Sequence, residues 1–223
     1  MNRILVVRHG ESESNANPEV MIQKPDVAIE LTNKGKLQAS DSGYFISEYI
    51  NKYKQYKNVI VHSSTYQRAS NTADIIKDII SNKCNVKVER TYSDYLVEII
   101  QGNFIYMHGK GIKYYQKHFP FDFENWRIQC TDKRGIYFAR RPNGESYFDV
   151  SCRIKDEIIK AKEASKTNSC LFIVVAHGLT NRCFAKESLN KDIDWFLDLD
   201  NPFNCEVWEL DFNKDELNSL HIP

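Results

Sequence analysis

The chain has 223 residues, long enough for one well-packed domain, and its 42% hydrophobic and 27% charged residues are ordinary for a globular protein. Thirty lysines and arginines balance thirty aspartates and glutamates, which excludes the strong net positive charge of many proteins that bind nucleic acid or anionic membranes. A site for an anion must therefore be local and built from a few convergent basic groups.

Two strand–helix units are predicted in the first third of the chain. Residues 4–7 (ILVV) form an apolar run typical of a buried strand, which ends abruptly at Arg8 and His9. Thr32 is a suitable N-cap for a helix that continues to about residue 50. Residues 58–64 (NVIVHSS) predict a second buried strand, and residues 68–80 carry apolar side chains at helical spacing.

The alternation of strands and helices continues toward the C-terminus. Residues 85–90 predict a short strand, 143–165 a helix with one apolar face, 171–176 (LFIVVA) the most hydrophobic strand, and 205–212 a half-buried strand. This order predicts an α/β fold, with a mostly parallel central sheet covered by helices on both faces. Because no repeat, low-complexity tract or linker interrupts the sequence, we expect a single domain over residues 1–223.

The stretch at residues 95–141 fits the alternation least. It is rich in aromatic side chains, histidine, glycine and charge. We expect it to be an insertion that lies over the edge of the sheet, because excursions of this kind often line binding sites.

Cysteine usage and hydropathy indicate the compartment. The six cysteines form no CxxC pair and no metal-like cluster, which favours free thiols over a disulfide framework. The first apolar run is four residues long, too short for a signal peptide, and no segment has the length of a membrane span. We therefore expect a cytoplasmic protein with no membrane contact.

Polar residues follow three of the predicted strands at the points where these strands end. Arg8 and His9 follow the first, Ser64 leads to Arg68 after the second, and His177 precedes a glycine after residues 171–176. The carboxyl ends of parallel strands meet in one crevice, where open α/β sheets bind their ligands. Guanidinium groups and helix N-termini favour anions there, and phosphate above all.

Five stretches of the chain resemble one known family. They are RHGESESN (8–15), LTNKGKLQA (31–39), SSTYQRASNTA (63–73), PNGES (142–146) and VVAHG (174–178). In this order they are similar to the histidine phosphatase (phosphoglycerate mutase-like) superfamily, and the resemblance covers nearly the whole chain. It implies the fold of that family, with the stretch at 95–141 lying over the active site.

The resemblance also implies roles for individual residues. His9 corresponds to the family's phosphorylated histidine, with His177 as a second catalytic residue. The phosphate would be bound by the residues at the matching positions, namely Arg8, Asn15, Arg68 and Gly178. The chemistry agrees, since a neutral imidazole can attack phosphorus when one ring nitrogen is free and the other is held by a hydrogen bond.

A carboxyl group is needed to protonate the leaving oxygen and then to activate water. In the family this residue lies in the middle third of the chain, several residues before a glycine, and the matching candidate is Glu98 in YLVEIIQGNF. Its surroundings are only loosely similar to the family, so Glu89, Asp94 and Glu145 remain alternatives.

Two other groups of charged residues have open roles. Glu11 and Glu13 could form a metal site with the histidines, but two nearby arginines would repel a divalent cation, so we expect no metal. Arg140 and Arg141 could contact the substrate at the pocket mouth or could be solvated loop charges.

The branch of the family is indicated by what the motifs lack. Cofactor-dependent phosphoglycerate mutases carry a Trp before the Asn of the first motif, where this chain has Ser14, and ERHYG where it has EIIQG. RHGESESN and GNF look more like the broad-range acid phosphatase branch. We therefore predict a metal-independent phosphatase, with a 2,3-bisphosphoglycerate-dependent mutase as the alternative and a non-catalytic relative that binds phosphorylated ligands as a third reading.

The expected partners follow from this function. The substrate would be a phosphorylated small molecule or a phosphopeptide, and neither a cofactor nor nucleic acid is needed. The sequence is compatible with a homodimer. It does not identify the substrate.

Overall fold

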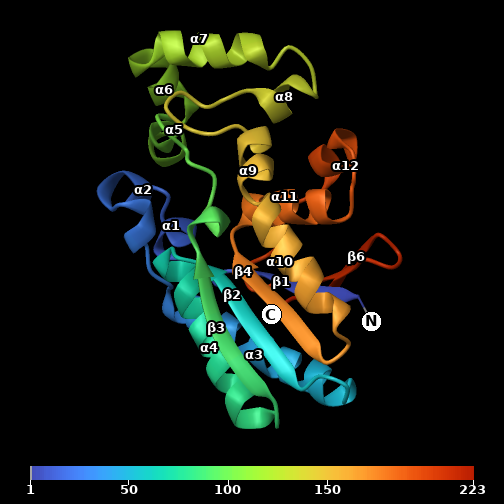
Figure 1. The fold of residues 1–223 in the computed structure, drawn as a ribbon. Coiled ribbons are helices and arrows are strands. Elements are labelled where there is room, and N and C mark those ends of the chain that lie inside the picture. Colours follow the sequence, from blue (N-terminus) through green and yellow to red (C-terminus); the bar gives the residue numbers. More distant parts are fainter. Residues whose placement is uncertain (1) are drawn as a thin grey trace.

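A computed structural model describes residues 2–223, whose centre is a six-stranded sheet in the order β3-β2-β4-β1-β5-β6 (Figure 1). The strands are β1 (Arg3–Arg8), β2 (Asn58–Ser64), β3 (Lys87–Ser93), β4 (Cys170–Ala176), β5 (Val207–Asp211) and β6 (Glu216–His221). The first four strands are parallel, and β5 and β6 pair antiparallel at one edge. The predicted mostly parallel α/β sheet is confirmed.

Each central strand contributes to two hydrophobic cores. Along β1, Ile4 and Val6 belong to one core, and Leu5 and Val7 belong to the core on the other face. This division follows from the two-residue period of a strand, which sends successive side chains to opposite faces. Since both faces are buried, β1 and β4 are apolar along nearly their whole length.

Helices cover both faces of the sheet, as predicted (Figure 1). One core includes α3 (Asn33–Lys52) and α4 (Gln67–Lys83), and the other includes α9 (Tyr147–Arg153), α10 (Lys155–Lys166) and α11 (Gly178–Ser188). The predicted N-cap is confirmed, because the Thr32 hydroxyl accepts a hydrogen bond from Gly35 N at 3.0 Å.

The structure differs from the predicted elements in four places. The strand expected to be half-buried over 205–212 is β5, and all five of its residues are buried. The helix expected over 143–165 bends at Ile154, where α9 passes into α10 while its backbone still bonds to Val150 and Ile158. The third strand is β3, at Lys87–Ser93, rather than residues 85–90. The strand β6 was not predicted, because its polar, partly exposed sequence ELNSLH lacks an apolar alternation.

The stretch at 95–141 is helical and stands beyond the carboxyl ends of the parallel strands (Figure 1). We call its four helices the cap helices: α5 (Phe104–Lys110), α6 (Ile112–His118), α7 (Pro120–Gln129) and α8 (Gly135–Phe138). Phe104 packs edge-to-face against Tyr115 and Trp126, with ring centroids 5.3 and 5.0 Å away. The remaining short elements are α1 (Glu13–Ala16), α2 (Val20–Gln23), η1 (Asp26–Ala28), η2 (Asp94–Leu96) and α12 (Ile193–Asp198).

Hydropathy gives no candidate for a membrane span. Within residues 2–223, no helix combines the length and apolarity that crossing a bilayer requires.

Candidate active site

The predicted residues at the ends of β1, β2 and β4 lie together. Arg8 and Ala176 are partners in the pairing of β1 with β4, so the histidines that follow them are neighbours. The His9 and His177 rings pack edge-to-face with centroids 5.2 Å apart, and both residues are buried, at 4% and 0% exposure. Together with Arg8 and Arg68 they form what we call the phosphate cradle.

One ring nitrogen of His9 is held by the backbone. His9 Nδ1 lies 2.7 Å from Gly10 O, so Nδ1–H donates to this carbonyl and the lone pair is left on Nε2. Burial lowers the pKa of His9 well below its ordinary value, and the positive charges of Arg68 and Arg8 add to the shift. The imidazole is therefore neutral at neutral pH, as a nucleophile must be.

Close backbone packing explains the glycine after His9. A Cβ at Gly10 would lie 2.3 Å from Gly35 O, and a Cβ at Gly35 would lie 2.0 Å from Glu11 O. The turn after β1 therefore rests directly on the first turn of α3, which fixes the position of His9.

Arg68 is fixed in the first turn of α4 and faces His9. Its Nη1 donates to the backbone and side-chain oxygens of Asp26, both at 2.8 Å, while its Nε donates to His9 Nε2 at 3.3 Å. The guanidinium carbon lies 5.2 Å from the Tyr66 ring centroid. The guanidinium therefore lies directly beside the nitrogen that carries the His9 lone pair, where it can bind the oxygens of a phosphoryl group.

Arg8 and His177 each retain unused hydrogen-bonding atoms. Arg8 Nη1 donates to Pro202 O at 2.7 Å, and His177 Nε2 lies 2.9 Å from Ser64 Oγ. Arg8 Nε and His177 Nδ1 are buried and have no hydrogen-bond partner in the described part of the chain. Buried polar atoms without partners are costly, and a bound anion would satisfy these two.

His177 is also neutral in this environment. Burial lowers its pKa well below the ordinary value, and Arg68 lowers it further. Burial likewise lowers the pKa of Arg8, although the nearby Glu98 carboxylate opposes that shift. Gly178 begins α11 directly after His177, at a helix N-terminus where backbone N–H groups favour an anion.

Glu98 lies beside the N-terminus of α11, next to the cradle. Its carboxylate accepts hydrogen bonds from Ile99 N at 3.0 Å, Thr180 Oγ1 at 3.2 Å and Thr180 N at 3.3 Å. Leu179 N donates to its second oxygen at 3.4 Å. Glu98 is the candidate acid/base residue that the fold brings to the cradle.

The three alternative carboxylates have other surroundings. Glu89 lies exposed on β3, and Asp94 is exposed and accepts from Thr65 Oγ1 at 2.7 Å. Glu145 accepts hydrogen bonds from Arg153 on both oxygens, at 2.8 and 3.2 Å. None of these arrangements resembles that of Glu98.

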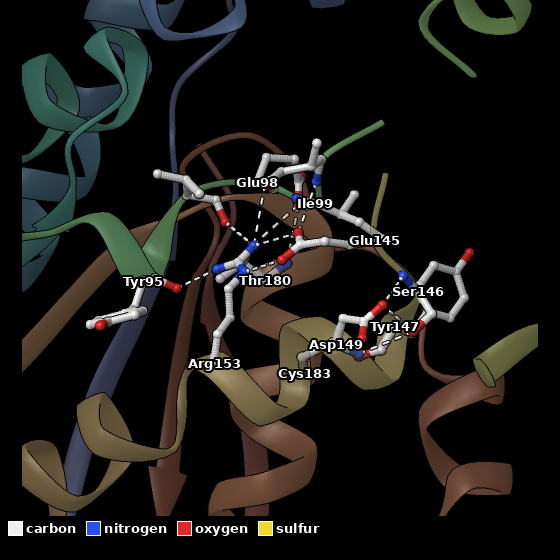
Figure 2. Close-up of polar contacts among 12 residues, drawn as sticks. Tyr95, Glu98, Ile99, Glu145, Ser146, Tyr147, Asp149, Arg153, Thr180 and Cys183 are labelled. Carbon is white, nitrogen blue, oxygen red and sulfur yellow. Dashed lines mark hydrogen bonds and ion pairs between the residues drawn. The ribbon is translucent and has the colours of Figure 1, made fainter. Parts of the chain in front are cut away.

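A clamp built around Arg153 holds the backbone that carries Glu98 (Figure 2). The Arg153 guanidinium donates to the carbonyls of Tyr95, Val97 and Glu98, the last two at 2.8 and 3.3 Å. It also forms a partly buried ion pair with Glu145 at 2.8 Å. The extended segment around Glu98 has few backbone partners of its own, so these contacts position it.

Glu145 holds the far end of the same segment. Its Oε2 accepts from Ile100 N at 2.9 Å, and Glu145 N donates to Ile100 O at 2.9 Å. Arg153 and Glu145 therefore fix the backbone on both sides of Glu98. Sequence reasoning did not find Arg153 because an arginine on a helix carries no motif signal, and it named Glu145 only as an alternative acid.

Asn15 lies at the mouth of the cradle and is exposed. Its Oδ1 accepts hydrogen bonds from Ser12 N and Ser12 Oγ, at 3.1 and 3.0 Å, and from Asn204 Nδ2 at 3.1 Å. Asn204 Nδ2 also donates to His9 O at 3.0 Å. The oxygen of Asn15 thus caps α1, and contact between its amide nitrogen and phosphate stays a prediction.

Ion pairs occupy three of the four charged residues whose roles the sequence left open. Lys34 binds Glu11 at 2.8 Å, and Lys24 binds Glu13 at 2.7 Å. Arg140 forms an exposed ion pair with Asp149 at 2.8 Å. Arg141, in contrast, lies over the Tyr147 ring, with the buried Nη1 unpartnered in the part of the chain described.

Three further residues of the site were missed by sequence reasoning: Asp26, Ser64 and Tyr66. Ser64 was noted at its strand end without a role, and its hydroxyl orients His177. Tyr66 packs on the His177 ring at 5.4 Å, and Asp26 orients Arg68 from the start of η1, more than forty positions earlier. A link between positions so far apart leaves no local pattern.

Comparisons with known proteins agree with this geometry. A family model described as Histidine phosphatase superfamily (branch 1) matches residues 4–222. Phosphoglycerate mutase-like protein AT74 of Arabidopsis thaliana is 28% identical over 238 residues, covering 99% of this chain and 68% of that protein. Broad-range acid phosphatase DET1 of Saccharomyces cerevisiae is 31% identical over 109 residues, covering 34% of this chain and 33% of that protein.

A similar fold is found among solved structures. Mycobacterial glucosyl-3-phosphoglycerate phosphatase, solved in complex with VO3, has a TM-score of 0.66 and 19% sequence identity, covering 95% of this chain and 91% of that chain. At this identity the likeness shows the fold alone.

Proposed function

The chain belongs to the histidine phosphatase superfamily, branch 1, and from that membership we propose that it hydrolyses phosphomonoesters through a phosphohistidine on His9. The observation that carries the proposal is the state of the His9 ring. Nδ1–H donates a hydrogen bond to Gly10 O, which leaves the lone pair of the neutral imidazole on Nε2, and Nε2 accepts a hydrogen bond from Arg68 Nε at 3.3 Å.

In the first step, His9 Nε2 forms a bond to phosphorus as the bond from phosphorus to the ester oxygen breaks. Phosphoryl transfer depends mainly on positioning and on stabilising charge on the phosphoryl oxygens. Arg8 and Arg68 supply permanent positive charge, and Arg8 Nε is a buried donor available to an oxygen. This route uses neither a metal ion nor an organic cofactor.

Glu98 then serves both halves of the reaction. As a carboxylic acid it gives its proton to the departing ester oxygen, which leaves as an alcohol. As a carboxylate it takes a proton from the attacking water, whose oxygen bonds to phosphorus while the bond to His9 breaks. Its carboxylate accepts hydrogen bonds from the backbone of Leu179 and Thr180 in the first turn of α11, directly after His177 and Gly178, and this place supports the role.

A bisphosphoglycerate-dependent mutase is the alternative, and one observation favours it. Arg141 presents a buried guanidinium nitrogen with no partner within residues 2–223, and such a cation could hold a substrate carboxylate. Against it, Asn103 donates to Asp122 at 2.7 Å and Phe104 is buried among the cap helices, so neither replaces the mutase residues missing from the loop after Glu98.

The deciding assay incubates the protein with 3-phosphoglycerate, with and without 2,3-bisphosphoglycerate, and measures 2-phosphoglycerate and free phosphate. A panel of phosphomonoesters and a phosphopeptide runs in parallel. We expect phosphate release from several esters, unaffected by bisphosphoglycerate. Rapid bisphosphoglycerate-dependent interconversion with negligible phosphate release would put the mutase first.

We also propose a cytoplasmic location, which the six free cysteines support. The single domain over residues 1–223 and the homodimer both stay predictions.

A further inference from the structure

A small pocket adjoins the phosphate cradle between α2 and α5. Its volume is about 160 Å³, and its walls include Met21, Asp26, Tyr66, Ile100, Gln101 and Ile105. We call it the leaving-group pocket.

Two residues that line this pocket, Asp26 and Tyr66, also contact residues of the phosphate cradle. Asp26 binds the guanidinium of Arg68, and the Tyr66 ring packs against both Arg68 and His177. The alcohol part of an ester whose phosphoryl group lies in the cradle can therefore enter this pocket. None of the four cradle residues lines either this pocket or the pocket of about 170 Å³ that contains Arg141, but only the leaving-group pocket is lined by Asp26 and Tyr66, which contact the cradle.

The size and apolar character of the leaving-group pocket suit one ring. An apolar protein cavity of about 150 Å³ is known to hold a benzene molecule, and this pocket has about 160 Å³. Met21, Ile100, Ile105 and the ring of Tyr66 present carbon to it. A group of about six or seven carbons fills such a space and gains by leaving water.

The polar atoms of the pocket further restrict the chemical class of the ligand. Gln101 lines the pocket, and its Oε1 is buried with no hydrogen-bond partner in the described chain, so a donor group on the ligand would satisfy it. The charge in the lining belongs to Asp26, which is already paired with Arg68 at 2.8 Å. The lining thus offers no cation to a second anionic group and places a carboxylate near it.

We propose that the substrates of this protein are phosphomonoesters of an apolar alcohol about one ring in size that carries a hydrogen-bond donor for Gln101. A second negative charge on the alcohol is selected against by Asp26. This inference rests on the proposed function, because it names the substrate class of the same site.

The test compares three aryl esters whose phenols have similar acidities: phenyl, 4-(hydroxymethyl)phenyl and 4-carboxyphenyl phosphate. Glycerol 3-phosphate serves as a small polar reference. For the natural chain we expect kcat/KM to be highest for the hydroxymethyl ester, by about three- to tenfold over phenyl phosphate, as suits one neutral hydrogen bond. The carboxyphenyl ester should be the poorest aryl substrate.

Two variants assign these preferences to the pocket. Gln101→Leu should bring the ratio between the hydroxymethyl and phenyl esters close to one. Ile105→Lys should raise the carboxyphenyl ester relative to phenyl phosphate, because it places a cation in the pocket. The matched control is Gln129→Leu on α7, an exposed glutamine outside the pocket, which should keep the ratios of the natural chain.

The outcomes separate this inference from the proposed function. Hydrolysis of glycerol 3-phosphate with equal or better use of the carboxyphenyl ester, or a hydroxymethyl preference that survives Gln101→Leu, overturns the pocket alone. Absence of phosphate release from all four esters overturns the proposed function and the pocket with it. The ratios measured on the natural chain remain decisive even if a variant folds poorly.

Discussion

The phosphate cradle and the cap helices above it are stabilised in different ways. Cradle side chains extend from the ends of β1 and β4 and from the start of α4, and backbone and side-chain hydrogen bonds hold them. The cap helices α5–α8 pack through aromatic rings, and large apolar residues there are exposed, such as Phe121 at 84%. The cradle is therefore positioned by the sheet, whereas the cap is held together mainly by contacts among its own aromatic rings.

This contrast predicts that losses of activity grow steeply toward the cradle. The largest should come from His9→Ala, which we expect to lower kcat by on the order of 10⁴–10⁶-fold, as when an enzyme loses its nucleophile. The comparison is His118→Ala on α6, an exposed histidine of the cap helices, which should retain turnover. Steady-state phosphate release measures both, with circular dichroism to show that each variant folds. Full activity in His9→Ala would remove His9 from the nucleophile role.

Arg68→Ala should cost roughly 3–4 kcal/mol of transition-state stabilisation, a fall of about 10²–10³-fold in kcat/KM, as for loss of one preorganised donor. It should also weaken inhibition by vanadate, whose oxygens need the same guanidinium. Arg127→Ala, which removes an exposed arginine of α7 paired with Glu124, is the matched control in the cap. Unchanged vanadate inhibition in Arg68→Ala would contradict the assignment of Arg68 to the phosphate cradle.

The Arg153 clamp connects the two regions, because it holds the segment that runs from η2 into the cap. Arg153→Met should free Glu98 and slow esters that need a protonated leaving group by roughly 10- to 100-fold. The loss on p-nitrophenyl phosphate should be much smaller, since its leaving group needs little help, and Glu98→Gln should show the same pattern.

The control for the clamp is Arg140→Met, which breaks the exposed pair with Asp149 on the same side of the molecule. A loss in Arg153→Met that is equal for alkyl and p-nitrophenyl esters would point to general destabilisation rather than to the positioning of Glu98.

The buried histidines of the cradle make stability depend on pH. The pKa values of His9 and His177 are lowered well below the ordinary value of about 6.5. As pH falls below that value, the unfolded chain binds protons that the folded chain does not, so the free energy of unfolding decreases. Urea unfolding at pH 7 and pH 5 should show this decrease, and His177→Gln should make it smaller. A free energy that rises toward pH 5 in the natural chain would mean that these imidazoles are charged in the fold.

The same contrast explains what could be predicted from the sequence. Most of the cradle is built from residues adjacent to strand ends, so an apolar run followed by Arg8-His9 or His177-Gly178 predicts that these residues lie together, as they do in the structure. Gly10 marks a turn whose tight contact with Gly35 leaves no room for a side chain. Local sequence and three-dimensional position coincide there.

Contacts between residues far apart in the chain could not be predicted, because no local sequence pattern marks them. Asp26 binds Arg68 from η1, Arg153 binds backbone carbonyls around Glu98, and β6 is held by pairing with β5 rather than by an apolar alternation. The cap helices were recognised only as a departure from the pattern, because their aromatic residues pack against one another instead of forming one stripe.

The central claim is that the reaction passes through a phosphohistidine on His9, and rapid quenching tests it most directly. The protein is mixed with ³²P-labelled substrate, quenched in alkali, digested and mapped by mass spectrometry. We predict label that is stable in base and lost in acid, carried by the peptide containing His9 and absent from His9→Ala. Phosphate release without labelled protein, or label on another residue, would contradict it.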